Sequence, residues 1–403
     1  MTGPSEWLRA AEVAPLECQR DEFSLPQGMV YLNCAYMGPL PNSVRDAGAR
    51  ALAARASPAG IGAEAFFEPA ERARRGCAAL VNADPERTAL VTSTAQAVAL
   101  AIRNLAIAPG RTVVVPGEQF PSNVLGWRRL ARTGVELKTV PRPEDDAALA
   151  AGLSVAGLWN RRLVEAIDER CAAVAIEPGH WTDGTRFDLE AVGARARAVG
   201  AAVIVDATQF VGAMALDVAR LQPDLLVAHA YKSMLSHYGL GFAVFGPRFA
   251  EDDAMVPLDE HWMVRRDAEI FTQLVDYQDA FAPGMRRFDT NVRASTVLVE
   301  SLAEATRRLQ DWRPERVEAR CRRVSKAFDA AARGLGYGAA EPADRTANLF
   351  GLRAPAGTDL EALRQRLRSE NIYVSIRGES LRVSLHVYND DGDLETLVRA
   401  LAA

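Results

Sequence analysis

The sequence predicts an α/β protein with a largely parallel sheet, followed by a small C-terminal α+β domain. Between about residues 85 and 245, short apolar runs alternate with helical patterns, and this pattern changes after Pro283. The 403 residues exceed the size at which one hydrophobic core stops growing, so two domains are expected. We predict a large domain at 31–285, a small domain at 286–403, and an N-terminal segment, 1–30, that packs with the small domain.

Six apolar runs have the length of a buried strand and are rich in valine and alanine, which is typical of strands covered on both faces. They read TALVTS, RTVVVPG, CAAVAIE, AAVIVDA, DLLVAHA and LGFAVFG. Helical patterns such as TAQAVALAIRNL and DLEAVGARARAVG lie between several of them, and the second opens on an Asp188 cap with Glu190 in its first turn. Repeated strand–helix–strand units predict a mainly parallel sheet with helices on both faces.

The C-terminal part begins with two long arginine-rich helices within 294–337. A run NLFGLR, a helix from Asp359 to Ser369, the strands IYVSIR and LRVSLH and a final helix DLETLVRALAA follow. Strands clustered with helices in this way predict a small α+β domain. The turn RGES between the last two strands is too short to carry an insertion.

The composition excludes several classes of protein. A net charge of -5 gives no indication of a nucleic-acid or anionic-membrane partner. The five cysteines are scattered without a CxxC pair, and the five histidines show no ligand spacing, so neither a disulfide framework nor a metal site is expected. With no export signal and no apolar stretch of about 18 residues, we predict a cytoplasmic protein.

Lysine is rare in this chain, which makes Lys232 conspicuous. Of 47 Lys and Arg residues only three are lysines, and Lys232 directly follows the apolar run DLLVAHA and Tyr231. Lost solvation lowers the pKa of an amine and exposes its neutral form, whereas a guanidinium stays protonated. Lys232 is therefore a candidate Schiff-base former. The alternative is a surface lysine whose stem packs on apolar neighbours.

Two further stretches carry matching chemistry. Asp206 ends the run AAVIVDA, where a buried carboxylate must be paired or bound, and a helix cap or ion pair is the alternative. Ser93 and Thr94 lie where a strand gives way to a helix, so hydroxyls and free N–H groups face one spot; a plain N-cap is the alternative. Pyridoxal phosphate (PLP) needs a lysine, an acid at its ring nitrogen and anion-binding amides.

Seven motifs recur in order from about residue 30 to 403: YLNCAYMGPLP, VTSTAQAV, GEQFPSNVLGW, VDATQFVG, HAYKSMLSHYGLG, PGMRRFD and LRVSLHVYN. In these the chain resembles the class V aminotransferases, PLP-dependent fold-type-I enzymes that include cysteine desulfurases, kynureninases, isopenicillin N epimerases and serine-type transaminases. The resemblance implies a large PLP-binding domain with a mainly parallel sheet of the seven-stranded type, an amino-acid substrate, and a homodimer with a shared active site.

The resemblance also assigns roles to individual residues. It implies that Lys232 condenses with the PLP aldehyde, that Asp206 pairs with the pyridine nitrogen, and that Gln209 lies near the ring hydroxyl. Phe120 would stack on the ring, Ser93 and Thr94 would hold the phosphate, and His229 and Tyr231 are further cofactor candidates. Arg382 matches the arginine that binds the substrate α-carboxylate, with an edge-strand surface arginine as the alternative. Tyr36 would face the neighbour's site. The stretch HWTDGTR is expected to form a loop over the hydroxyl side of the cofactor, where Trp181 and Thr182 contact substrate; a structural turn is the alternative.

Three departures from the family pattern bear on the reaction. The stretch SIRGESLRVS has a tight turn and no cysteine, which disfavours cysteine desulfuration by persulfide transfer. Tyrosine precedes Lys232 where desulfurases have histidine, as in the kynureninase and epimerase branches. RRFDTNVRAS lacks the glycine expected after RFD, so the partner-subunit phosphate contact is not carried over to Thr290 and Asn291.

The reaction stays open between several outcomes at the α-carbon. Transamination is our first hypothesis because it needs no catalytic group beyond the lysine. Epimerisation and β-elimination are the alternatives within enzymes, and a degenerate PLP-binding protein is the alternative outside them. A dinucleotide-binding protein is disfavoured because no GxGxxG follows the first strand.

Overall fold

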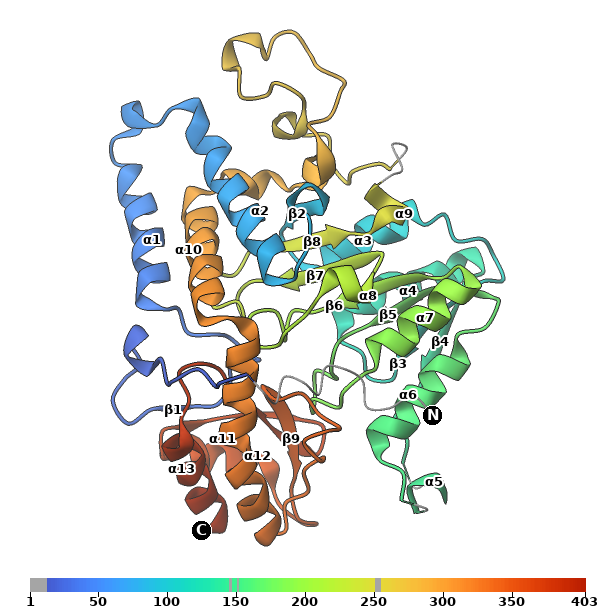
Figure 1. Cartoon of the computed structure of the whole chain (residues 1–403), viewed down its shortest axis with the longest axis vertical. Coiled ribbons are helices and arrows are strands. Elements are labelled where there is room, and N and C mark those ends of the chain that lie inside the picture. Colours follow the sequence, from blue (N-terminus) through green and yellow to red (C-terminus); the bar gives the residue numbers. More distant parts are fainter. Residues whose placement is uncertain (1–12, 145–146, 151, 251–254) are drawn as a thin grey trace.

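A seven-stranded sheet forms the centre of the protein (Figure 1). The computed structural model describes residues 13–144, 147–150, 152–250 and 255–403. The sheet has the order β2-β8-β7-β6-β5-β3-β4. Its strands are β2 (Thr88–Val91), β3 (Thr112–Pro116), β4 (Glu136–Val140), β5 (Cys171–Ile176), β6 (Ala202–Asp206), β7 (Leu225–His229) and β8 (Gly241–Phe245). Only β8 runs in the direction opposite to the other six strands, so the expected mainly parallel sheet is confirmed.

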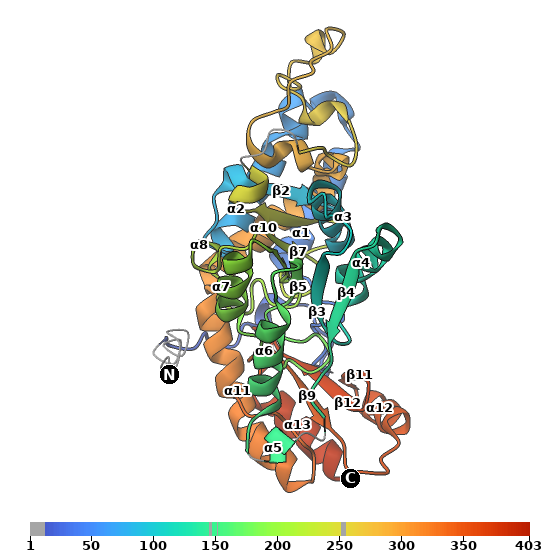
Figure 2. The ribbon, with the colours of Figure 1, turned by 90° about the vertical axis from the view of Figure 1, so that its right-hand side faces the viewer.

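Strict alternation of side chains gives this sheet two buried faces. Val113 and Val115 of β3 point into one apolar cluster and Val114 into the other, and β5, β6 and β7 alternate in the same way. Helices α3 (Thr94–Asn104), α4 (Leu125–Arg129) and α9 (Pro247–Ala250) contribute to one cluster. Helices α6 (Val155–Ala166) and α7 (Leu189–Val199) cover the other face (Figure 2). Short helices α5 (Ala147–Ala150) and α8 (Val218–Leu221) complete this part.

Three helices, α1 (Asn42–Ala54), α2 (Glu68–Leu80) and α10 (Thr296–Trp312), lie together on the side of the molecule away from α6 and α7 in Figure 1. Helix α10 packs along α1 and α2, so segments far apart in sequence lie side by side. At Arg313, where φ is 64°, the chain turns into α11 (Pro314–Gly334), which leads to the C-terminal part. The two long helices predicted within 294–337 are confirmed.

The C-terminal part holds a three-stranded antiparallel sheet, β11-β12-β9, and two helices. Its elements are β9 (Leu349–Arg353), α12 (Leu360–Ser369), β10 (Ile372–Tyr373), β11 (Ser375–Arg377), β12 (Ser380–Ser384) and α13 (Asp391–Ala402). The prediction of one strand over IYVSIR is wrong. Its first half, β10, pairs in parallel with β1 (Val30–Tyr31), and only its second half, β11, pairs with β12.

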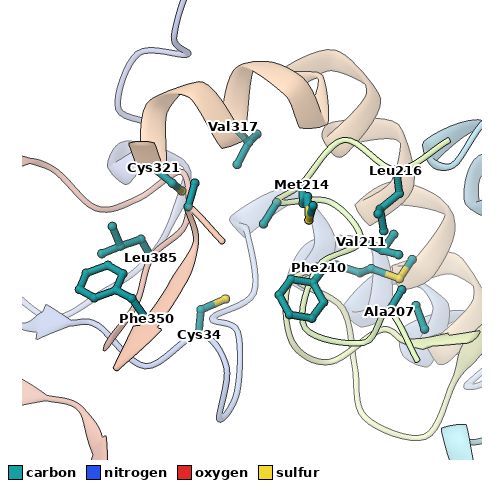
Figure 3. Packing of buried hydrophobic residues seen from close by; sticks show 14 of the residues in the cluster. Cys34, Ala207, Phe210, Val211, Met214, Leu216, Val317, Cys321, Phe350 and Leu385 are labelled. Atoms are coloured by element: carbon teal, nitrogen blue, oxygen red, sulfur yellow. The ribbon is translucent and has the colours of Figure 1, made fainter. Parts of the chain in front are cut away.

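The chain start lies against this C-terminal part. The N–H of Leu16 donates to the carbonyl of Arg316, and the N–H of Gln19 donates to that of Val387. Residues 1–12 of the predicted segment 1–30 lie outside the described residues. The apolar cluster on the α6–α7 side of the large sheet continues into the C-terminal part, so that Phe210 and Met214 belong to the same cluster as Val317 and Phe350 (Figure 3). Within the described ranges, no helix is long and apolar enough to cross a bilayer.

Candidate active site

The carboxyl ends of β2, β3, β5, β6 and β7 meet at one edge of the sheet, and a pocket opens there. Most of the residues singled out from the sequence line this pocket, although they come from separate motifs. They are Ser93, Thr94, Phe120, Trp181, Asp206, Gln209, His229, Tyr231 and Lys232. Ligands collect at this edge of open α/β sheets because each strand delivers the following residues to the same place.

Lys232 lies in a turn that the preceding strand and a distant loop hold in place. The N–H of Leu235 donates to the Lys232 carbonyl, and the N–H of Gly38 donates to that of Tyr231. The Lys232 side chain is buried, and its Nζ lies 5.1 Å from the centre of the Phe120 ring. It forms no ion pair or hydrogen bond with any described residue. Burial lowers its pKa from 10.5 to about 8, with nearby Asp206 acting in the opposite direction.

Gly38 explains the glycine in the motif YLNCAYMGPLP. A Cβ atom at this position would collide with the Lys232 carbonyl oxygen and come within 2.8 Å of the Leu235 side chain. We expect Gly38→Ala to lower the free energy of unfolding by about 1–3 kcal/mol, since the backbone must move to relieve the overlap. Gly60→Ala is the matched control, because nothing lies within 4 Å of its Cβ position. Equal unfolding midpoints in denaturant for the two variants would contradict this close approach.

Asp206 ends β6 below the lysine and is 5% exposed. Its Oδ1 accepts the backbone N–H of Thr208 at 3.0 Å. The Thr208 hydroxyl in turn lies 3.0 Å from that of Thr94 and accepts the backbone N–H of His229. Burial raises the pKa of Asp206, while the hydrogen bonds from Thr208 and the charge of Lys232 act against this rise. A cationic ring nitrogen would therefore find a buried carboxylate here that lacks a full ion-pair partner.

The start of helix α3 offers an anion site beside a histidine without partners. Ser93 caps the helix, and its Oγ accepts the Gln96 N–H at 3.1 Å. The alternative of an N-cap is therefore correct for Ser93, and this bond uses one lone pair of its oxygen. His229 is 3% exposed, and neither of its ring nitrogens has a hydrogen-bond partner among the described residues. Its ring packs against those of Tyr231 and Tyr238 at 4.7 and 4.8 Å. Unpaired buried nitrogens next to a helix N-terminus suit a phosphate.

Glu177 is one of four pocket residues that the sequence reasoning missed; the others are Ser122, Thr208 and Tyr238. It follows β5, is 2% exposed, and accepts the backbone N–H of Trp181 at 2.9 Å. Burial raises its pKa well above the usual range, and the Asp206 charge adds to this effect. The signal was present in CAAVAIE, where an acid directly follows an apolar strand, as in AAVIVDA. The rule that selected Asp206 would have selected Glu177 as well.

Trp181 separates the pocket from the C-terminal sheet. Its ring meets Phe120 edge-on at 5.3 Å, and its indole N–H donates to the Glu118 carbonyl. Arg382 of β12 donates from Nη1 to the Trp181 carbonyl at 3.0 Å. Two further nitrogens of this buried guanidinium, Nε and Nη2, have no partner. The alternative of a surface arginine is therefore wrong for Arg382.

Of the remaining candidates, Tyr36 lies outside the pocket and Gln209 lies inside it. Tyr36 is 58% exposed and lies outside the pocket, on a surface groove that it shares with Arg377. Gln209 donates from Nε2 to the Ala35 carbonyl at 3.3 Å, and its Oε1 has no partner. The structure thus brings the cofactor candidates together in one pocket and places Tyr36 outside it.

Comparison with known proteins agrees with this geometry. The profile of the family described as Aminotransferase class-V matches residues 51–331 of the chain. The chain belongs to the class-V aminotransferase family. The family is PLP-dependent, and the matched residues include the whole large sheet and the helices α2, α3, α6, α7 and α10.

Relatives within the class-V family differ in their reactions. The isopenicillin N epimerase of Streptomyces clavuligerus is 26% identical over 97% of this chain and 98% of the epimerase. A probable cysteine desulfurase of Methanothermobacter thermautotrophicus is 30% identical over 55% of this chain, and the match spans about half (54%) of that relative. The chain is thus similar to both an epimerase and a desulfurase at comparable identity.

Solved structures confirm the fold-type-I architecture expected of a class-V aminotransferase. The cysteine desulfurase of Thermococcus onnurineus superposes with a TM-score of 0.80 at 18% identity, covering 97% of this chain and 98% of the desulfurase. A C-DES variant with glycine covalently linked to its PLP cofactor gives a TM-score of 0.81 at 17% identity, covering 95% and 99%.

Proposed function

We propose that this protein is a PLP-dependent enzyme that acts at the α-carbon of an amino acid, with transamination as its reaction. The observation that carries the proposal is the amine of Lys232, which is buried and unpaired and lies in one pocket with Asp206. A catalytically degenerate binding protein would have no need of a desolvated amine held without an ion-pair partner.

The residues present fit PLP. Lys232 would hold the aldehyde, Asp206 the ring nitrogen, and the start of α3 with His229 the phosphate. The ring would lie beside Phe120, and the unpaired Oε1 of Gln209 would face its hydroxyl. When bound, PLP supplies an aldehyde for the substrate amine and a ring that withdraws electrons from the α-carbon.

The chain's own groups then bind the substrate and move its proton. Arg382 would bind the α-carboxylate through Nε and Nη2, the two nitrogens that lack partners. Lys232, with its lowered pKa, would take the α-proton as general base near neutral pH. A single base suffices for transamination, because the Lys232 amine would both take up the α-proton and release it again.

Epimerisation is the second candidate, and two observations favour it. The isopenicillin N epimerase aligns over nearly the full length of both chains. Epimerisation also needs a proton carrier other than Lys232, and Glu177 is a buried carboxyl group in the same pocket whose pKa burial raises well above its usual range. Desulfuration is disfavoured because the β11–β12 turn carries Gly378 and Glu379 and no cysteine, and because burial raises the pKa of the Cys34 thiol to about 12.

One experiment separates these reactions. Holoenzyme is incubated with an amino-acid panel and a keto-acid acceptor in deuterated water, and keto-acid formation, α-deuteration and β-group release are followed in parallel. We expect keto acid that requires the acceptor. Deuterium at Cα without keto acid would show that the reaction is epimerisation and not transamination. Protein that stays colourless with added PLP would reject the proposed function altogether.

The rate of PLP attachment should report the pKa of Lys232. The neutral amine is the reactive form, so below pH 8 the rate is expected to rise about tenfold per pH unit, and above pH 8 to level off. A solvated lysine would continue to rise to about pH 10. Apoprotein mixed with PLP at a series of pH values, followed by absorbance, measures this profile. A rate that still rises beyond about pH 9.5 would contradict the buried amine.

We also propose a homodimer with a shared site, and the domain limits 31–285 and 286–403. The segment 255–283 projects from the molecule with Val275 79% and Tyr277 92% exposed, an apolar surface that a second copy would cover (Figure 1). Sedimentation of the holoenzyme tests the dimer.

All five cysteines are free, which supports a reducing, cytoplasmic location.

A further inference from the structure

A second arginine lies beside Arg382 on the same face of the small sheet. Strands β11 and β12 are antiparallel, and Ser375 is the direct partner of Arg382. Arg377 lies two residues after Ser375, so it shares the face of Arg382 and is its diagonal neighbour. Such neighbours lie about 7 Å apart, within reach of long side chains.

Trp181 brings the two guanidinium groups to one place. The Cζ atoms of Arg377 and Arg382 lie 5.6 and 5.9 Å from the centre of its ring. The same indole meets Phe120 edge-on, and Phe120 in turn lies next to the Lys232 amine. The arginine pair therefore stands at the end of a short aromatic path that begins at the reactive amine.

Neither arginine has a carboxylate partner among the described residues. Arg377 donates only to the carbonyl of Ile376, and Arg382 donates only to that of Trp181. Asp183, the acid that packs over this sheet at Gly351, already pairs with Arg142. Two unpaired cations on adjacent strands repel each other, and an anion bound between them would relieve this repulsion.

The charges of Arg377 and Arg382 favour the binding of an anion between them. Burial, together with the charge of Arg377, lowers the pKa of Arg382 to about 9. One α-carboxylate satisfies the two free nitrogens of Arg382 and leaves Arg377 uncompensated. A second negative charge on the same ligand would remove this repulsion.

We propose that the site takes amino acids that carry a second carboxylate on the side chain, and that Arg377 binds this distal carboxylate. The proposal rests on the proposed function in that Arg382 takes the α-carboxylate. Acidic residues such as Glu118 and Glu379 also line the neighbouring cavity, so its overall charge does not select anions. Selection comes from the position of Arg377 beside Trp181.

The test compares binding of matched acids that lack an amine. Holoenzyme is titrated calorimetrically with glutarate and adipate, and with pentanoate and hexanoate of the same chain lengths. We expect the dicarboxylates to bind about tenfold tighter or more, as a charge-assisted pair predicts. In Arg377→Met this preference should fall below about threefold, and Arg377→Lys should restore part of it. Arg382→Met should weaken both classes of acid.

Arg368→Met is the matched control, since Arg368 is exposed on the same surface groove and does not contact Trp181. A similar loss of preference in Arg368→Met would show general electrostatic steering and overturn the proposal. Equal binding of glutarate and pentanoate to the unaltered holoenzyme would overturn it too. Both results leave the proposed function intact if the protein still takes up PLP, whereas failure to take up PLP rejects the proposed function itself.

Discussion

Lys232→Ala is expected to abolish covalent attachment of PLP and to lower turnover by about 10³-fold or more, because one amine both holds the cofactor and moves the α-proton. The readout is direct in this chain, which has only three lysines. Borohydride reduction of the holoenzyme followed by peptide mapping should place the adduct on Lys232 and nowhere else. The variant should show no adduct while still binding PLP without a covalent bond.

Lys326→Ala and Lys138→Ala are the matched controls. Lys326 is exposed, and the Lys138 amine is occupied by the Ala166 carbonyl at 2.8 Å and the Asp168 carboxylate at 3.3 Å. Both variants should retain the adduct and the activity. An adduct that moves to Lys138 or Lys326, or that persists in Lys232→Ala, would disprove the role of the buried amine.

Asp206→Asn is expected to lower turnover by about 10²-fold or more while leaving the folded structure in place. The amide keeps the shape of the side chain and can still accept the Thr208 N–H, but it cannot hold a positive charge on a ring nitrogen. Because burial already disfavours the charged form of Asp206, removing its charge should cost little stability. Steady-state kinetics and thermal unfolding, measured on the same preparations, separate the two effects.

Asp217→Asn serves as the control for loss of one negative charge, because Asp217 caps the short helix α8 far from the pocket. Its activity should equal that of the unaltered protein. If Asp206→Asn retained more than about half of the activity, the cofactor ring would need no acid from this chain and the proposed geometry would fail.

Much of the fold and of the candidate site could be predicted from the sequence, because both depend on local signals. Valine-rich runs flanked by helical patterns defined six of the seven central strands. The ends of those runs then gave Ser93, Asp206 and Lys232 without any knowledge of their separation in space. Burial on both faces makes such strands uniform, so a polar residue at their end stands out.

The remaining features depend on contacts between distant segments. Strand β4 escaped notice because it lies at the sheet edge and exposes much of its surface, which leaves no apolar run. The split of IYVSIR into β10 and β11 depends on β1, about 340 residues earlier. The pairing of Arg377 with Arg382 around Trp181 required the register of two strands and the position of a loop from the other part of the chain.

The apolar cluster that joins the large sheet to the C-terminal part, with Phe210, Val317 and Phe350 among its members, has a mechanical consequence (Figure 3). Together with hydrogen bonds such as the one from Arg382 to the Trp181 carbonyl, it fixes the distance between an amine carried by the large sheet and guanidinium groups carried by the small one. Enlarging or trimming a side chain at this junction would thus alter which substrate lengths fit, with every reactive atom unchanged.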